Sequence, residues 1–348
     1  MIQQNRIYWI DCIKTILIYL MVLGHITTTN PDFKQWIYTF HMPCFFIVSG
    51  FLYKPSSIKK SFESLFFPVF IISIFNLLYR FIILFYGFKI PWDLKIYILY
   101  PINSFILFPS SQISSDIFTG LWYIEILFLL KILTDKFHSW ISTLILVIIC
   151  TIYHLLKINN IFPLLNNLLI ERIFHCYFFF IVGVYIHKVK FVEVLKKIPK
   201  SIAFFCAILS LCCLYIMSKQ MGTIDIYSSL YGNNYILYNI IPPLYFISFS
   251  FLFYSIERFI KTTFIEDISI GTLLILGIHS TIISIISRIL KMIGYDISII
   301  PYWILGIIIL LITLVPIKYF KKKYPIMLGK TSIKLKNENR TKIYSIRC

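Results

Sequence analysis

Three ionisable residues, Asp11, Lys14 and His25, interrupt the first long apolar run of the sequence. A neutral histidine takes up a proton near pH 7, and a lysine supplies positive charge to a developing anion. These residue types could therefore act as a general base beside a stabilising charge. They could equally pass protons along a relay, with the carboxylate of Asp11 as a third member.

The spacing of the three residues places them on one stripe of a helix. His25 lies about 20° beyond three full turns from Lys14, and about 40° short of four turns from Asp11. Because an ionisable group at membrane depth costs about 2.5–3.5 kcal/mol, we expect the stripe to face a bundle interior or a water-filled cavity. Asp11 and Lys14 also form an i,i+3 pair that can neutralise itself. A structural role, with the pair orienting the helix and His25 at the interface, fits this geometry equally well.

The second apolar segment, TFHMPCFFIVSGFLYK, adds His41 and Ser49 as candidate site residues. Pro43 is tolerated in the first turn of a helix, so it predicts that a helix begins at His41. Ser49 and Gly50 are small and offer a polar position where another helix or a ligand can approach closely. Ser-Gly pairs are also common in simple packing.

Two further charged residues lie in later apolar segments. A carboxylate facing lipid is costly, so we expect Glu125 either to line a site or to pair with a buried cation such as Arg80. Arg172 either contacts a substrate at the outer face or anchors its helix at the interface. His279, in a late apolar segment, fits packing better than function.

The elements that position these residues are membrane-spanning helices. Of the 348 residues, 59% are hydrophobic and 14% are charged, whereas a soluble domain has about 45–50% apolar and 25% charged residues. Apolar runs of about 20 residues recur along the chain, each long enough to cross a hydrocarbon core about 30 Å thick. We expect an all-α integral membrane protein with about ten transmembrane helices, near 7–27, 36–53, 64–86, 118–134, 139–156, 173–187, 201–218, 236–256, 268–290 and 301–319. The segment 96–108 could be interfacial or re-entrant.

Basic residues set the expected orientation. With a cytoplasmic N-terminus, inside segments hold 23 of the 33 Lys and Arg residues, outside segments hold seven, and three lie within spans. Because Lys and Arg accumulate in cytoplasmic loops, we expect a multi-pass protein of the cell (plasma or inner) membrane with both termini in the cytoplasm. This topology explains the net charge of +18 without a nucleic-acid partner. The eight cysteines show no metal-ligand spacing, so we expect no metal site.

The first two segments carry a resemblance to a known family. RIYWIDCIKTILIYLMVLGH followed by FHMPCFFIVSGFLYK resembles the start of the acyltransferase-3 family, integral membrane enzymes that acylate sugars, lipids and antibiotics. The branch of fucose 4-O-acetylase-like proteins is the most similar. The family pattern of a basic residue, ten intervening residues and a histidine falls on Lys14 and His25. Its FHMP-x-FF-x-x-SG motif falls within 40–51. Weaker similarities to the family pattern follow at 121–128, 171–186 and 270–283.

The chain departs from the family pattern in two respects. Many members have Arg at the position of Lys14, and many carry a soluble domain after the membrane part. Here the resemblance implies a transmembrane acyltransferase domain over 1–320 and a basic cytoplasmic tail over 321–348. The tail is expected to lie on anionic lipid, at about 1 kcal/mol per basic residue near the surface.

The resemblance implies O-acyl transfer from a cytoplasmic acyl-CoA, with acetyl-CoA as the expected donor. The expected acceptor is a hydroxyl of a cell-surface glycan or a lipid-linked sugar. His25 would be the base, assisted by Asp11 and by Lys14 as an electrostatic stabiliser or as the group that orients His25. Since Lys14 and His25 are about 16 Å apart along the helix axis, we expect a polar tunnel through the bundle. Its expected lining is Asp11, Lys14, Ser49, Glu125 and His41, with Arg172 at the acceptor side.

A polytopic transporter or flippase with an Asp-Lys-His relay is the alternative. It would move a substrate without covalent change, whereas an acyltransferase leaves an acylated acceptor and a free CoA thiol. The sequence shows no internal repeat of the kind found in many transporters. It leaves the oligomeric state open.

Overall fold

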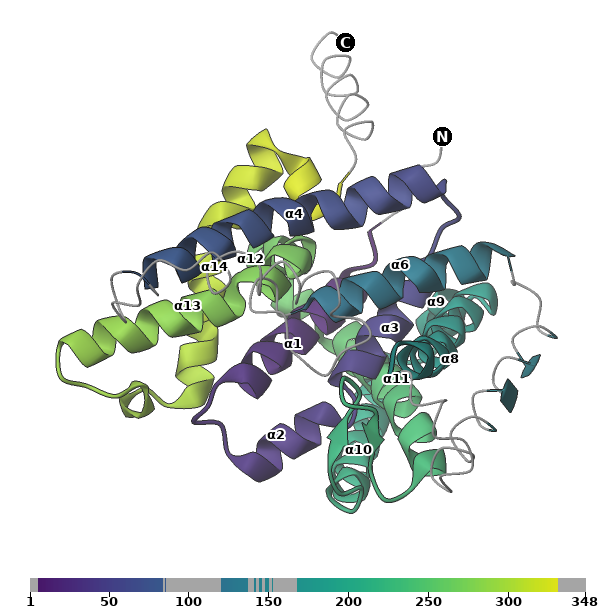
Figure 1. The fold of residues 1–348 in the computed structure, drawn as a ribbon. Helices are drawn as coiled ribbons and strands as arrows, with labels where there is room; N and C mark the ends of the chain where they lie inside the picture. Colours follow the sequence, from purple (N-terminus) through teal and green to yellow (C-terminus); the bar gives the residue numbers. More distant parts are fainter. Residues whose placement is uncertain are drawn as a thin grey trace, which may run out of the picture.

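A computed structural model of the chain describes residues 6–83, 85, 120–136, 141, 144–145, 148–149, 152 and 168–330. Figure 1 shows that this part is a helical bundle, as predicted. Its longer helices are α1 (Tyr8–His25), α4 (Ile58–Ile82), α6 (Leu121–Lys136), α8 (Leu168–Lys188), α10 (Lys200–Lys219), α11 (Tyr235–Ile260), α13 (Thr272–Met292) and α14 (Tyr302–Lys323). Its shorter helices are α2 (Pro31–Tyr38), α3 (His41–Phe51), α9 (Phe191–Lys197), α12 (Thr263–Ile270), η5 (Ile297–Ile299) and η6 (Pro325–Leu328). One small hairpin pairs β1 (Ile224–Asp225) with antiparallel β2 (Leu230–Tyr231).

Six of the described helices are long and apolar enough to cross a membrane: α1, α4, α10, α11, α13 and α14. Two more, α6 and α8, coincide with the spans predicted at 118–134 and 173–187. The predicted span at 139–156 lies mostly outside the described residues, and the segment 96–108 lies wholly outside them. The structure therefore supports a helical membrane protein, while the number of ten spans stays a prediction.

The prediction of one continuous span over 36–53 is wrong. The structure divides this region into α2 and α3, because Phe40 leaves the helical conformation with φ −141° and ψ −25°. At 1.5 Å per residue, the 11 residues of α3 rise about 16 Å, too little to cross a bilayer. The prediction that a helix begins at His41 is confirmed. The span predicted over 268–290 is likewise divided, at Gly271, into α12 and α13.

Helix α1 lies in the middle of the bundle (Figure 1). It packs against α3, α11, α12, α13 and α14. Its spanning window is 72% buried, whereas that of α10 is only 22% buried and presents apolar side chains such as Phe205 and Leu209 outward. The polar residues of α1 therefore lie inside protein, while α10 is placed to face lipid.

Two glycines allow α3 and α8 to pack with their backbones in contact. A Cβ atom on Gly50 would lie 1.8 Å from the carbonyl oxygen of Phe180. A Cβ atom on Gly183 would lie 2.0 Å from the carbonyl oxygen of Ile47. No other residue type fits at either position, which confirms the predicted close approach beside Ser49.

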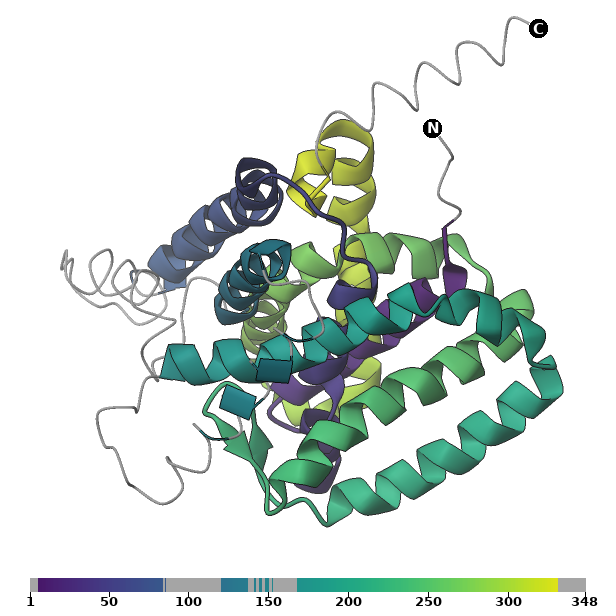
Figure 2. The same ribbon diagram turned by 90° about the vertical axis from the view of Figure 1, so that its right-hand side faces the viewer.

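The start of α1 and the end of α14 meet at α12. Arg6 forms an ion pair with Glu266, and Lys321 forms one with Asp267 at 2.6 Å. The start of α1 and the end of α14 therefore lie on the same side of the molecule (Figure 2).

Candidate active site

The polar stripe of α1 faces the bundle interior, as expected, and its neighbours there are α12 and α13. Asp11 accepts a hydrogen bond from the hydroxyl of Ser269 at 2.5 Å, and Lys14 donates to the Ser269 carbonyl oxygen. His25 packs against His279 with ring centroids 4.8 Å apart. The second carboxylate oxygen of Asp11 pairs with Arg6, and among the described residues Asp11 forms no ion pair with Lys14.

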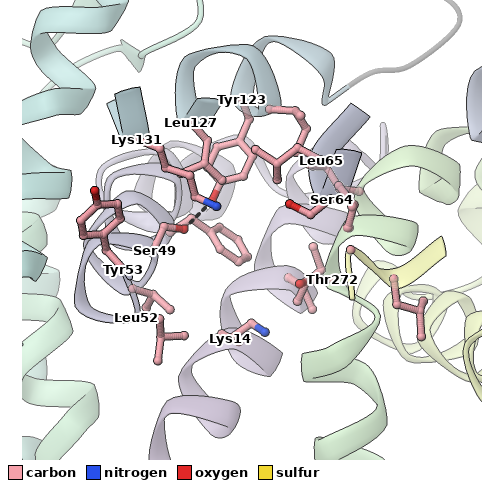
Figure 3. A pocket seen from close by; sticks show the side chains of 18 of the residues that line it. Lys14, Ser49, Leu52, Tyr53, Ser64, Leu65, Tyr123, Leu127, Lys131 and Thr272 are labelled. Carbon is pink, nitrogen blue, oxygen red and sulfur yellow. Dashed lines mark hydrogen bonds between the residues drawn. The ribbon is translucent and has the colours of Figure 1, made fainter. Parts of the chain in front are cut away.

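Lys14 lines a cavity of about 460 Å³ that is enclosed by α1, α3, α4, α6, α13 and η6. We call it the lysine cavity, since Lys14, Lys54 and Lys131 line it and no carboxylate does so among the described residues. Figure 3 shows Lys14 entering from α1 and Lys131 from the opposite wall. The hydroxyls of Ser49 and Tyr123 are hydrogen-bonded at 2.9 Å on the same lining. Most other lining residues are apolar, so the cavity combines positive charge with an apolar wall.

His25 lines a second cavity, of about 170 Å³, which we call the histidine cavity. His41 and His279 also line it. His41 Nδ1–H donates to the carbonyl oxygen of Ile37 at 2.8 Å, and His279 Nδ1–H donates to that of Leu276 at 3.0 Å. Because a carbonyl only accepts, these bonds leave the lone pair of both rings on Nε2.

The ring of His25 is held differently from the other two. Its side chain is exposed to the cavity, and among the described residues neither of its nitrogens has a hydrogen-bond partner. Within the described part of the chain, no three His, Cys, Asp or Glu side chains converge well enough to hold a metal ion. His25 is therefore the imidazole whose nitrogens are open to an incoming group.

The two cavities share a wall. Met42 and Leu276 line both of them, and no other described residue does. Gly120 makes room for this wall, since a Cβ atom there would lie 2.3 Å from Cγ of Leu276. Lys14 and His25 stand on the two sides of the wall, about 16 Å apart along the continuous helix α1. At that distance Lys14 cannot orient the ring of His25 directly.

The predicted single tunnel is thus two adjacent cavities. Lys14 and Ser49 line the first and His41 lines the second, whereas Asp11 and Glu125 line neither. Asp11 instead ties the start of α1 to α12.

Arg172 and Glu125 lie behind the histidine cavity. Arg172 is fully buried, and its guanidinium lies 4.3 Å above the ring of Tyr227, a residue of the cavity lining. Glu125 interacts electrostatically with Arg172. Arg172 therefore supports the wall of the cavity from behind and is neither in contact with its interior nor exposed at an interface.

Several lining residues were not predicted as site residues. Tyr123, Leu127 and Lys131 all line the lysine cavity, and their spacing of four residues puts them on one helical stripe that the sequence already contains. Lys131 is one of the 23 Lys and Arg residues assigned to the inside in the sequence analysis, where it served only to set the orientation. Asp225 and Tyr227 reach the histidine cavity from the β1–β2 hairpin, a short loop structure without a periodic pattern. His279, assigned to packing, stands beside His25.

A family model described as an acyltransferase domain matches residues 7–318. The matched range contains the whole described lining of the histidine cavity and all of the lysine cavity except Leu328 and Gly329. No curated protein and no solved structure matches the chain significantly.

Proposed function

This chain belongs to the acyltransferase-3 family, and we propose the donor and the acceptor of this membrane acyltransferase and the cavity that binds each. The donor is a cytoplasmic acyl-CoA, specifically acetyl-CoA, and the acceptor is a hydroxyl of a cell-surface glycan or a lipid-linked sugar. One observation carries the proposal: helix α1 supplies Lys14 to one cavity and His25 to the next, and Met42 and Leu276 line both.

The lysine cavity suits the donor. Its volume lies in the usual range for small-molecule sites, about 300–1,000 Å³. Three ammonium groups with no described carboxylate among them attract phosphates and other anionic parts of a CoA ester. The apolar side chains beside them accommodate the pantetheine arm. Positive-inside topology supports access from the cytoplasm, since Lys54 follows a span in a segment expected there and Lys131 lies near the expected cytoplasmic end of the span predicted over 118–134.

The histidine cavity suits the acceptor. It is lined by aromatic rings of Trp122, Tyr38 and Tyr227 together with the carboxylate of Asp225. Rings that cover apolar faces, with a few polar groups between them, are typical of sites for small polar ligands. The resemblance to fucose 4-O-acetylase-like proteins supports a sugar as that ligand.

In the proposed reaction, the hydroxyl oxygen of the acceptor attacks the thioester carbon, and His25 accepts the proton of that hydroxyl. The new C–O bond forms as the C–S bond breaks, and the proton passes to the departing thiolate. Lys14 acts on the donor in the lysine cavity, because it is too distant from His25 to share a reacting atom with it. Met42 and Leu276 must part enough for the acyl end of the donor to reach His25.

The test is acyl transfer from radiolabelled acetyl-CoA by membranes that contain wild type, Lys14→Ala or His25→Ala, supplied with cell-envelope glycans. Label should enter the glycan with wild type and disappear with His25→Ala. A correctly inserted His25→Ala protein that keeps the wild-type rate would overturn the role of His25.

The transporter alternative is tested in the same membranes. It predicts substrate movement without an acylated product or free CoA thiol. Membership of the acyltransferase-3 family favours the enzyme.

A further inference from the structure

A third cavity, of about 720 Å³, lies between the start of α1, the short helix α9 and the facing ends of α10 and α11. It shares no described lining residue with the lysine or histidine cavity. Trp9 closes it toward the bundle interior, where the indole packs against Phe51 and Phe246. The cavity is therefore separate from the groups assigned to acyl transfer.

The charge of this cavity is strongly positive. Five basic and two acidic residues line it, an excess of three cations, namely Arg6, Lys196, Lys200, Arg258 and Lys261 against Glu193 and Glu257. Arg6 pairs with Asp11 and Glu266, and Lys200 pairs with Glu257 at 3.7 Å. Within the described part of the chain, Lys196, Arg258 and Lys261 have no ion-pair partner. We call this site the basic cavity.

Two helices begin at the basic cavity. Its lining includes Ile7 and Tyr8 at the start of α1 and Lys200 at the start of α10. Among the described residues, no side chain caps either N-terminus, because the N-cap positions are occupied by Ile7 and Pro199. A helix N-terminus carries about half a positive charge and free N–H groups, so both add to the attraction for an anion.

Large apolar side chains project from the same three helices beside the cations. Phe259 is 84% exposed next to Arg258, Val194 is 50% exposed near Lys196, and Ile202 is 52% exposed near Lys200. In a membrane protein, neighbouring basic and exposed apolar residues mark the depth at which headgroups meet hydrocarbon. A free soluble phosphate would gain nothing from the apolar neighbours, whereas a lipid would contact both kinds of group.

We propose that the basic cavity binds the phosphate headgroup of an anionic phospholipid. Lys196, Arg258 and Lys261 contact the phosphate. The acyl chains of the lipid lie against Val194, Ile202 and Phe259 on the outside of the bundle. Such a lipid would connect the start of α1 to α9, α10 and α11.

The test measures the Kd of dioctanoyl phosphatidylglycerol for the purified full chain in neutral detergent. The site variant is Lys196→Ala/Arg258→Ala/Lys261→Ala. The matched control is Lys59→Ala/Lys60→Ala/Lys322→Ala, which removes the same charge from exposed lysines that line none of these three cavities. The double variant Arg258→Gln/Lys261→Gln provides a milder change in case the triple variant does not fold.

The site variant should raise the Kd about tenfold or more and the double variant severalfold, while the control stays near wild type. Dioctanoyl phosphatidylcholine should bind at least about tenfold more weakly than phosphatidylglycerol, because its headgroup carries no net charge. An equal loss in the site and control variants would overturn the proposal, since binding would then follow net charge alone. Competition by inorganic phosphate or CoA at lower concentration than the lipid would overturn the lipid as the source of the phosphate.

Discussion

The lysine cavity is lined by three ammonium groups and no carboxylate, whereas the histidine cavity is lined by three imidazoles, one carboxylate and no lysine among the described residues. Both are built on α1, and they meet at Met42 and Leu276. Lys14, whose positive charge is suited to holding an anionic donor, thus lies about 16 Å along α1 from His25, which is suited to proton transfer. A lysine beside His25 would disfavour its protonated form, so the separation lets each cavity keep its own chemistry.

The largest effect is expected for His25→Ala. Removing a general base lowers the turnover rate by about 10²–10⁴-fold. The KM for acetyl-CoA should change little, because His25 is absent from the lysine cavity. Steady-state kinetics on purified protein, with thermal stability as the control, checks this split. A large rise in the donor KM with an unchanged kcat would reverse the assignment of the two cavities.

Lys14→Ala should affect the lysine cavity and the binding of the donor there. The loss of one of three ammonium groups should raise the KM for acetyl-CoA about tenfold, with a smaller effect on kcat. Lys14→Arg keeps the charge and should recover most of the affinity. If the KM for the acceptor rises while that for acetyl-CoA does not, Lys14 does not serve the donor.

Leu276→Ala should weaken the boundary itself. The lost side-chain volume opens the shared wall, so butyryl-CoA should gain a few-fold in rate relative to acetyl-CoA. The substitution also destabilises the protein by about 2–5 kcal/mol, as for other buried leucines. Leu305→Ala, a buried leucine of α14 that lines neither cavity, is the matched control. An identical chain-length preference in both variants would show that Leu276 does not bound the acyl group.

Tyr123→Phe should have the smallest effect. It removes the hydrogen bond to Ser49 but keeps the ring that packs in the lysine cavity. A neutral hydrogen bond contributes about 0.5–1.5 kcal/mol, so the KM for acetyl-CoA should rise severalfold at most. The measurement is the donor KM beside that of Ser49→Ala, which removes the same bond from its other end. A loss of turnover as large as that expected for a general base, about 100-fold or more, would place Tyr123 with the reacting atoms instead.

The features that could be predicted are those that helix geometry links to sequence spacing. The stripe of Asp11, Lys14 and His25 faces α12 and α13 because residues at these intervals share one side of a helix. Pro43 and Gly50 likewise indicated the start of α3 and its contact with α8, since each has one strong conformational or steric consequence.

The features that could not be predicted depend on contacts between distant segments. The wall between the cavities needs Met42 of α3 to meet Leu276 of α13. Asp11 binds Arg6 and Ser269 rather than Lys14, and only the packing of α12 against α1 decides that. The break between α2 and α3 occurs inside a continuous apolar run, where hydropathy alone predicts one span.

The most direct test of two cavities with separate roles is a cryo-electron microscopy map with a non-hydrolysable thioether analogue of acetyl-CoA. The account predicts density in the lysine cavity, with the analogue near Lys14 and Lys131 and its acyl end against Met42 and Leu276. Density in the basic cavity of α9, α10 and α11, or an analogue entering the histidine cavity from the side of Asp225, would contradict it.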